Sequence, residues 1–320
     1  MNEYDKDMLT YMNVFFPGYL ERNAQKLSDG QRLVYYTSAE TAQKIIQDQH
    51  LWLRNASLMN DFSEISYGLE FVAETLLRDS GQEFRDAVSE LNPEVLELTL
   101  DNLRGWEQDW RLETYISCVS EHDFSEDQSG RLSMWRAYGD VALVLNSTPF
   151  GAVTDKLKVY STEVNYWDGT HLKAHLDDII LKIDENSDYL SELSTNQFVG
   201  FLHEKFKIMA LATKHPGFKE EREWRIYFRP SELGEDDCIL SKKIVVLDGV
   251  PQTIWSLPLR HDPDNGLFHA DLPSLLDRLI IGPTEYPYVS AEAFRELLVR
   301  AGVDASDPKV TVSDIPLRSK

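Results

Sequence analysis

Residues 219–228 read Lys-Glu-Glu-Arg-Glu-Trp-Arg-Ile-Tyr-Phe, and the fold is best inferred outward from this stretch. From Glu221 onward, polar and apolar side chains alternate with the period of an extended strand. The apolar face would hold Trp224, Ile226 and Phe228, and the polar face would hold Glu221, Glu223, Arg225 and Tyr227. The two glutamates would then lie about 7 Å apart on one face, because each residue of a strand rises ~3.4 Å.

Two interpretations of this strand are open. In the first, the strand is half-buried, its polar face meets water, and Glu223 pairs with Arg225. In the second, the polar face lines a cleft, where a carboxylate on a rigid strand stabilises positive charge developing on a bound sugar. The neighbouring carboxylate would then accept a proton from an attacking group. The strand by itself does not separate the structural role from the catalytic one.

Short strands and helices alternate irregularly on both sides of this stretch. Residues 64–110 and 168–211 have helical spacing and predict two helical insertions. No glycine-rich turn joins a strand to a helix, which favours an α+β fold over a doubly wound parallel sheet. We expect a single domain over residues 1–320. The β-branched or apolar runs typical of strands include Leu33–Thr37, Thr114–Val119, Val141–Leu145 and Val310–Val312.

The composition narrows the class of partner. The chain has 54 acidic and 32 basic residues and a formal net charge of −22, and such a field repels phosphate backbones. A broad DNA-coating role is therefore disfavoured. No apolar run approaches the ~18 residues that a membrane span needs, and the N-terminus lacks the pattern of a signal peptide. Cys118 and Cys238 match no metal or redox spacing. Together these features predict a cytoplasmic protein with no membrane partner.

Three spaced signatures resemble those of a bacterial family of uncharacterised proteins. The first is an aromatic-aromatic-Thr-Ser strand at Tyr35 to Ser38, followed by an Asn-Asp-x-x-Glu loop at Asn60 to Glu64. The second is a serine-containing strand at Ser117 to Glu121, followed by Met-Trp-x-x-Tyr at Met134 to Tyr138. The third is Glu-x-Glu-Trp-Arg at Glu221 to Arg225, with a late Ile-Ile-Gly-Pro at Ile280 to Pro283. All occur in the expected order, which is more specific than any one alone.

That family is similar in arrangement to the ADP-ribosyltransferase fold, in which two facing, mostly antiparallel sheets grip NAD around a cleft. The resemblance implies an enzyme that cleaves NAD and transfers ADP-ribose to an acceptor, either a protein or a nucleic acid. Enzymes of this kind serve as bacterial toxins or phage-defence effectors, so a neutralising partner protein is a further expectation.

The resemblance also implies roles for individual residues. Catalysis falls to Glu223, and Glu221 would activate the acceptor. The NAD contacts would be Tyr35, Thr37, Ser38, Trp135, Tyr138 and Arg225. Many relatives have His where Tyr35 stands, so the ribose contact at that position is open. Trp135 and Tyr138 lie three residues apart, hence on one helical face, and core packing is the alternative for both. We expect Tyr35, Tyr138 and Glu223 to converge on one nucleotide-sized cleft.

The chemistry suits a carboxylate, because loss of nicotinamide leaves an oxocarbenium-like ribose that a fixed negative charge stabilises. Two other classes of function stay open. One is a non-catalytic module that binds a nucleotide or a partner protein in the same cleft. The other is a metal-dependent nuclease, in which Asn60, Asp61 and Glu64 join the two glutamates as ligands. A turn and helix cap is the alternative for Asn60 and Asp61.

The histidines do not predict a metal site. His171 and His175 have the i, i+4 spacing of a metal pair, but the sequence offers no third ligand nearby. A solvated helix face is therefore favoured for them. We assign no residue as a metal ligand.

Overall fold

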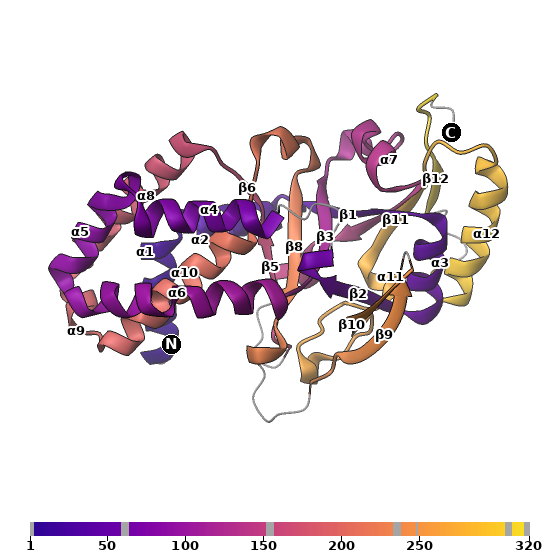
Figure 1. Ribbon diagram of the computed structural model, residues 1–320. Helices are drawn as coiled ribbons and strands as arrows, with labels where there is room; N and C mark the ends of the chain where they lie inside the picture. The colour runs from indigo at the N-terminus through magenta and orange to yellow at the C-terminus, as the bar shows by residue number, and fades with distance from the viewer. Residues whose placement is uncertain are drawn as a thin grey trace. The chain divides into compact units, whose positions relative to one another are not determined.

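The computed structural model describes residues 3–58, 64–151, 157–232, 238–247, 249–304 and 309–316. The loop predicted at Asn60 and Asp61 lies outside them. The chain divides into two compact units, where the sequence predicted one domain with two helical insertions (Figure 1). The helical unit comprises Met1–Gln25, Ala56–Thr114 and Val164–Lys219. The sheet unit comprises Lys26–Asn55, Tyr115–Glu163 and Glu220–Lys320.

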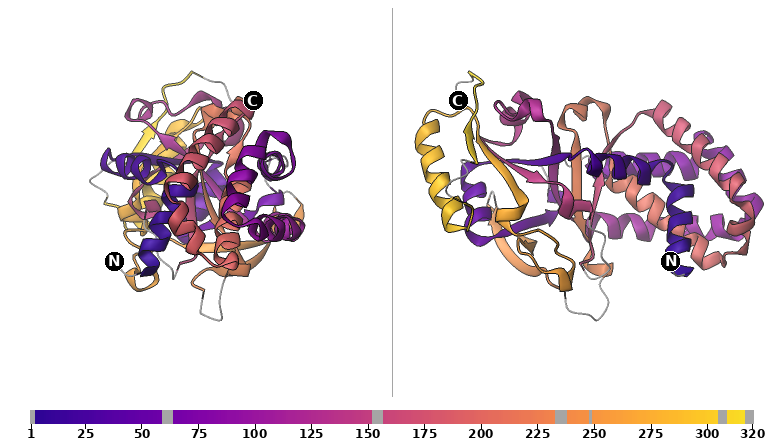
Figure 2. Two further views of the ribbon diagram at one scale, coloured as in Figure 1. Left: turned by 90° about the vertical axis from the view of Figure 1, so that its left-hand side faces the viewer. Right: turned by 180° about the vertical axis from the view of Figure 1, so that it is seen from behind.

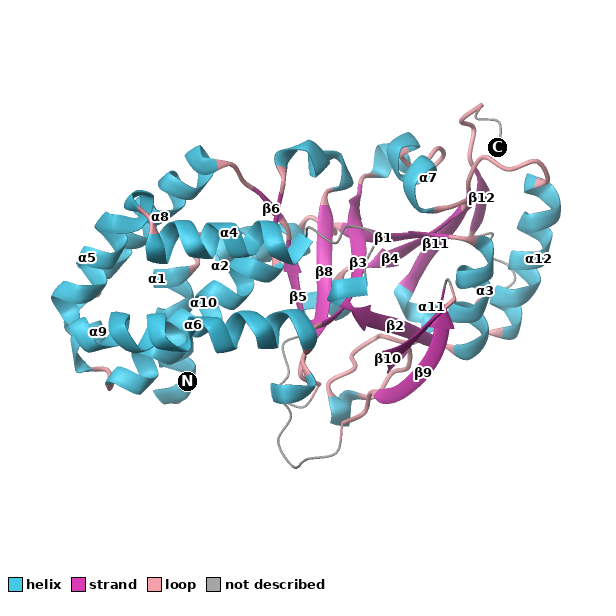
Figure 3. Cartoon of the chain, viewed as in Figure 1, coloured by secondary structure: helices cyan, strands magenta, loops and turns pink. Residues whose placement is uncertain are grey.

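The helical unit contains both segments that the sequence predicted to be helical, together with the N-terminal helices (Figure 3). Polar caps define where its helices begin: Asp168 and Ser194 accept backbone hydrogen bonds from the first turns of α8 and α10. A short parallel pair joins β6 (Asn165–Tyr166) to β7 (Thr213–Lys214). The α-helices are α1 (Glu3–Phe15), α2 (Tyr19–Ser28, which runs on into the sheet unit), α4 (Glu64–Leu77), α5 (Gln82–Leu91), α6 (Pro93–Leu112), α8 (Gly169–Glu185), α9 (Ser187–Glu192) and α10 (Thr195–Leu211).

The sheet unit is built on one ten-stranded sheet in the order β12-β11-β4-β1-β3-β2-β10-β9, with β8 paired to β3 and β5 paired to β8. The only parallel pair among its described strands is β11 with β12, so the prediction of a mostly antiparallel α+β fold is confirmed. The strands are β1 (Arg32–Thr37), β2 (His50–Asn55), β3 (Tyr115–His122), β4 (Val141–Asn146), β5 (Val159–Glu163), β8 (Glu223–Phe228), β9 (Ser241–Leu247), β10 (Val250–Pro258), β11 (Leu276–Ile281) and β12 (Val310–Val312). The α-helices are α3 (Ala39–Asp48), α7 (Leu132–Tyr138), α11 (Leu272–Leu275) and α12 (Pro287–Arg300).

The sheet divides at β3. Strand β8 pairs with β3 from Tyr115 to Ser120 along one edge. On the opposite edge, β1 pairs from Ser120 to His122 and β2 pairs at Tyr115 and Ile116. Two arms, β1-β4-β11-β12 and β2-β10-β9, therefore leave one edge of the same strand. The described strands of this unit therefore form one branched sheet with two arms.

The two faces of this sheet carry different layers. On one face, the apolar side chains, including Trp224, Ile226 and Phe228, belong to a core cluster that also contains residues of α3, α11 and α12. Figure 2 shows α12 beside α3 in this layer. The other face packs Val34 and Tyr36 against α7. The predicted apolar face of β8 therefore does lie in the core, because the alternation of side chains holds over this strand.

Candidate functional site

Strand β8 is buried along its whole length. All six of its residues are buried, whereas the sequence predicted either a water-facing or a cleft-facing polar side. Glu223 is 5% exposed and Arg225 is 1% exposed. The Arg225 Nε donates a hydrogen bond to the Glu223 Oε1 at 2.8 Å. The predicted Glu223–Arg225 pair is thus confirmed, but it lies inside the protein rather than on its surface.

Glu221 is not part of this strand, so the prediction that it shares a face with Glu223 was wrong. It ends a 3₁₀ helix, η5 (Pro216–Glu221), and β8 begins at Glu223. Between them, Arg222 has a φ of 43°, in the left-handed region that few non-glycine residues adopt. A left-handed residue breaks the alternation of an extended chain. The Glu-x-Glu motif is therefore a turn that separates its two carboxylates.

Tyr138 and Glu221 meet, although they are 83 residues apart in the sequence. The Tyr138 hydroxyl donates to the Glu221 Oε1 at 2.9 Å. Tyr138 ends α7 and is 37% exposed, while Glu221 is half-buried. A carboxylate and an aromatic ring therefore converge at a place that solvent reaches.

Trp135 has the packing role that the sequence left open. It is buried, its ring lies 4.8 Å from the Tyr36 ring, and its indole nitrogen donates to the Ser129 carbonyl at 2.9 Å. A Cβ added at Gly130 would lie 2.4 Å from the Trp135 ring, and one added at Gly282 would lie 2.7 Å from it. Close packing of the indole thus accounts for the glycine of the late Ile-Ile-Gly-Pro signature.

Tyr35 and Thr37 lie on the other face of the sheet from Glu223. Paired residues of adjacent strands point the same way, and Val34 pairs with Ser120, which pairs with Glu223. Tyr35 is one residue on, so it lies on the opposite face and packs against the core cluster there, where burial raises its pKa. This register does not support the single cleft that we expected for Tyr35, Tyr138 and Glu223.

Ser38 has a clear local role as the N-cap of α3. Its Oγ accepts a hydrogen bond from the Thr41 backbone nitrogen at 3.2 Å. The cap and the expected NAD contact would use the same hydroxyl. The geometry therefore accounts for Ser38 without a ligand.

Tyr36, rather than Tyr35, shares the face of Glu223. Its hydroxyl accepts from the Arg131 backbone nitrogen at 2.8 Å, and burial is the main cause that raises its pKa to about 12. Arg131 in turn donates a hydrogen bond to the Glu126 carboxylate, so the three residues form one chain of contacts. Sequence reasoning missed all three, because only the pairing of β1 with β3 shows which of the two tyrosines faces Glu223.

Of the two histidines for which we favoured a solvated helix face, only His171 is exposed. The His171 ring contacts Asp168 within the cap of α8, on the solvent side as expected. His175 is half-buried, with its ring 4.6 Å from Trp167 and its Nε2 against the Lys205 amine. Over the described ranges, no group of three or more His, Cys, Asp or Glu side chains could hold a metal ion.

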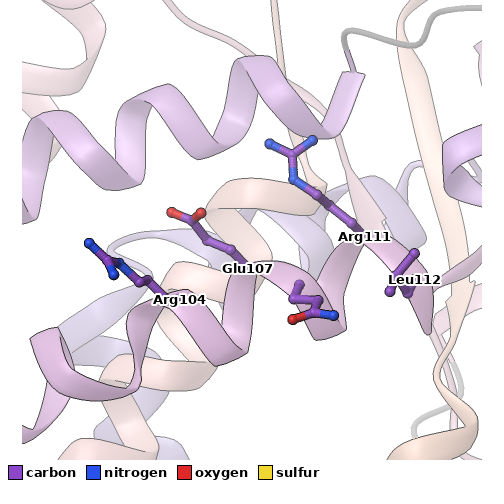
Figure 4. A pocket seen from close by; sticks show the side chains of 5 residues that line it. Arg104, Glu107, Arg111 and Leu112 are labelled. Carbon is purple, nitrogen blue, oxygen red and sulfur yellow. The ribbon is translucent and has the colours of Figure 1, made fainter.

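A surface depression lies along α6 in the helical unit and contains none of the predicted site residues (Figure 4). All five side chains that line it come from this one helix: Arg104, Glu107, Gln108, Arg111 and Leu112. Arg111 also donates to the Ser66 hydroxyl at 2.9 Å. With one helix as its wall, the depression is too open to enclose a nucleotide.

Comparison with known proteins finds one match. Residues 134–226 match a protein family of unknown function, DUF2971. The matched segment runs from α7 to β8, so it contains Tyr138, Glu221 and Glu223 but not Tyr35. No curated protein and no solved structure matches the chain. Among the described helices, none is long and apolar enough to cross a membrane.

Proposed function

We propose that this protein is an ADP-ribosyltransferase-like enzyme that cleaves NAD beside Tyr138 and Glu221 and transfers ADP-ribose to a macromolecular acceptor. The observation that carries the proposal is the 2.9 Å hydrogen bond between these two side chains. It joins the two ends of the segment that matches the family of unknown function. The toxin or phage-defence role, with a neutralising partner protein, remains part of this proposal.

The pair offers what the sugar chemistry needs. Cleavage of the nicotinamide–ribose bond leaves positive charge on the ribose, and the Glu221 carboxylate supplies a fixed negative charge to stabilise it. The Tyr138 hydroxyl orients that carboxylate, and its ring offers an exposed face on which an aromatic base can stack. Holding the carboxylate before the reaction starts reduces the reorganisation that the transition state requires.

Glu223 takes a supporting role in this proposal. A charge that stabilises the sugar must reach it, and Glu223 is buried and bonded to Arg225. We therefore assign the catalytic role to Glu221. Glu223 and Arg225 then anchor the start of β8, on which the turn with Glu221 depends.

The test is nicotinamide release from NAD by the purified chain. We expect Glu221→Gln to lower the rate roughly a hundredfold with folding retained, as for other single electrostatic groups. Tyr138→Phe should lower it by less, because the carboxylate keeps its charge. The matched control is Glu107→Gln on α6, which lies in the other unit and should release nicotinamide like the parent.

A second measurement separates an enzyme from a binding module. NAD at a hundred times its dissociation constant should stabilise the folded chain by ~2.7 kcal/mol. Stabilisation without nicotinamide release would indicate the non-catalytic module instead. If Glu221→Gln releases nicotinamide at the parent rate, the pair is structural and the proposal fails.

A further inference from the structure

The Glu126 carboxylate binds two arginines at once. Glu126 ends a short 3₁₀ turn, η3 (Phe124–Glu126), just after β3. Arg131 donates to its two oxygens through Nε and Nη2, each at 3.0 Å. The Nη2 of Arg222 lies 2.9 Å from both oxygens. Glu126 and Arg131 are largely buried, with 16% and 12% of their side chains exposed, so solvent screens these contacts little.

Arg131 connects this carboxylate to the backbone around Glu221. Its Nη1 donates to the carbonyls of Glu220 and Glu221 at 2.9 and 3.2 Å, and its Nη2 donates to the carbonyl of Glu121 at 2.8 Å. With the two bonds to Glu126, these contacts use all five N–H groups of the guanidinium. A side chain held this completely has one available position.

Arg131 is also the residue from which α7 begins. Its carbonyl accepts from the backbone nitrogens of Met134 and Trp135, each at 3.1 Å. The helix that starts here carries Tyr138 at its other end. The guanidinium of Arg131 fixes one partner of the candidate pair, and its backbone fixes the helix that carries the other.

Arg222 is held in its left-handed conformation from two sides. Its carbonyl accepts from the Glu121 nitrogen at 2.8 Å, and its side chain contacts both Glu126 and Asp123. An L-residue adopts this conformation only at an energetic cost, so the surrounding contacts must maintain it. The residue concerned is the one that separates Glu221 from Glu223.

We infer that Glu126 is a positioning residue of the candidate site. Its carboxylate holds Arg131 and Arg222, and through them it sets the position of the Glu221 turn relative to α7 and Tyr138. The catalytic consequence rests on the proposed function. The mechanical link between Glu126 and the hydrogen bond from Tyr138 to Glu221 does not depend on the proposed function.

A double-mutant cycle on melting temperature tests the link. Tyr138→Phe should lower the melting temperature of the parent by about 2 °C, the shift expected for loss of one hydrogen bond. In the Glu126→Gln background, Tyr138→Phe should lower the melting temperature by less than half as much, because the hydrogen bond between Tyr138 and Glu221 is already loosened. The matched control is Glu232→Gln, which loosens another carboxylate–arginine pair of the sheet unit, Glu232 with Arg229 at 2.6 Å. In the Glu232→Gln background, Tyr138→Phe should lower the melting temperature by as much as it does in the parent.

Arg131→Lys repeats the cycle if Glu126→Gln does not fold, since it keeps the positive charge but loses the planar fork of donors. An equal cost of Tyr138→Phe in every background would overturn the inference, since Glu126 would then be a purely structural residue. Where nicotinamide release is measurable, Glu126→Gln should lower kcat about tenfold, and should add little to Glu221→Gln. A chain that releases no nicotinamide but shows the coupling would refute the proposed function and leave this inference standing.

Discussion

Both units bury positive charge, but the helical unit contains a buried lysine whose environment differs from that of the buried arginines in the sheet unit. In the sheet unit, each of three buried guanidinium groups meets a carboxylate: Arg32 meets Asp127 and Asp277, Arg225 meets Glu223, and Arg229 meets Glu232. In the helical unit, the buried amine of Lys207 likewise meets the Glu204 carboxylate at 2.8 Å, but the buried amine of Lys205 meets the imidazole of His175 and the ring of Phe16. An imidazole supplies no negative charge to balance an ammonium group. Burial therefore lowers the pKa of Lys205 to about 7.

This difference predicts the pH range over which the stability of each unit should change. In the sheet unit, burial alone would raise the pKa of Asp277, but hydrogen bonds from Arg278 and Arg32 outweigh it and lower that pKa. Such a carboxylate stabilises the fold at neutral pH and loses its effect only in acid. The buried amine of the helical unit instead titrates near neutrality. The unit that contains the candidate site should thus be the less sensitive of the two around pH 7.

The largest expected effect is the pH dependence of the helical unit. The pKa of Lys205 falls from 10.5 in the unfolded chain to about 7, so between these values the unfolded state binds more protons. Stability should therefore rise with pH over this window, by on the order of 5 kcal/mol at most. Lys205→Met removes the titrating group and should flatten the rise. Urea unfolding followed by helical circular dichroism from pH 7 to 10 measures it.

The matched control is Lys173→Met on α8, which removes an exposed lysine of the same unit and should leave the rise intact. His175 adds a separate effect in acid, because burial, Lys205 and Arg22 together lower its pKa from 6.5 to about 2. Stability should fall as the pH drops through that range. An identical slope for the parent and Lys205→Met above pH 7 would remove the contrast between the units.

The next-largest expected effect concerns the buried ion pairs of the sheet unit. Glu223→Gln removes the charge that faces the buried Arg225 guanidinium, and breaking a buried pair from one side costs about 3–5 kcal/mol. We expect a large loss of stability by urea unfolding, unlike the half-buried Glu221→Gln. Glu232→Gln should lose less, because Glu232 is 24% exposed. A Glu223→Gln chain that is as stable as the parent but no longer cleaves NAD would return the catalytic role to Glu223.

Local patterns in the sequence predicted much of the fold. The strand from Glu223 to Phe228 and its apolar face are confirmed, because both depend on residues next to one another. The left-handed turn at Arg222 was missed, since no glycine or asparagine marks it. It is maintained by contacts with Glu126 and Asp123, about a hundred residues away in the chain.

The arrangement of the site was harder to predict, because it depends on the pairing of distant strands. One residue of register decides whether Tyr35 or Tyr36 shares a face with Glu223. The division of the sheet at β3 arises because β1 and β2 both pair with one edge of it, which no local pattern encodes. The contact between Tyr138 and Glu221 was not predicted either, because the order of the signatures indicated a cleft shared by Tyr138, Tyr35 and Glu223 instead.

The smallest expected effect compares one helix cap from each unit. Ser38 caps α3 and Ser194 caps α10, each through a hydroxyl that accepts a backbone N–H, from Thr41 and Gln197 respectively. Ser38→Ala and Ser194→Ala should each cost ~1 kcal/mol in urea unfolding, and Ser38→Asp should restore the loss because aspartate caps equally well.

The two caps differ in one respect, since the family resemblance makes Ser38 an NAD contact while Ser194 has no such expectation. The α3 helix packs on the face of the sheet opposite Glu223, so Ser38→Ala should leave nicotinamide release at the parent rate, as Ser194→Ala does. Loss of release in Ser38→Ala alone, with stability restored but release still absent in Ser38→Asp, would mean that the hydroxyl itself contacts the nucleotide. NAD would then bind on the face where Tyr35 lies, and the carboxylate that serves it would have to be sought there rather than at Glu221.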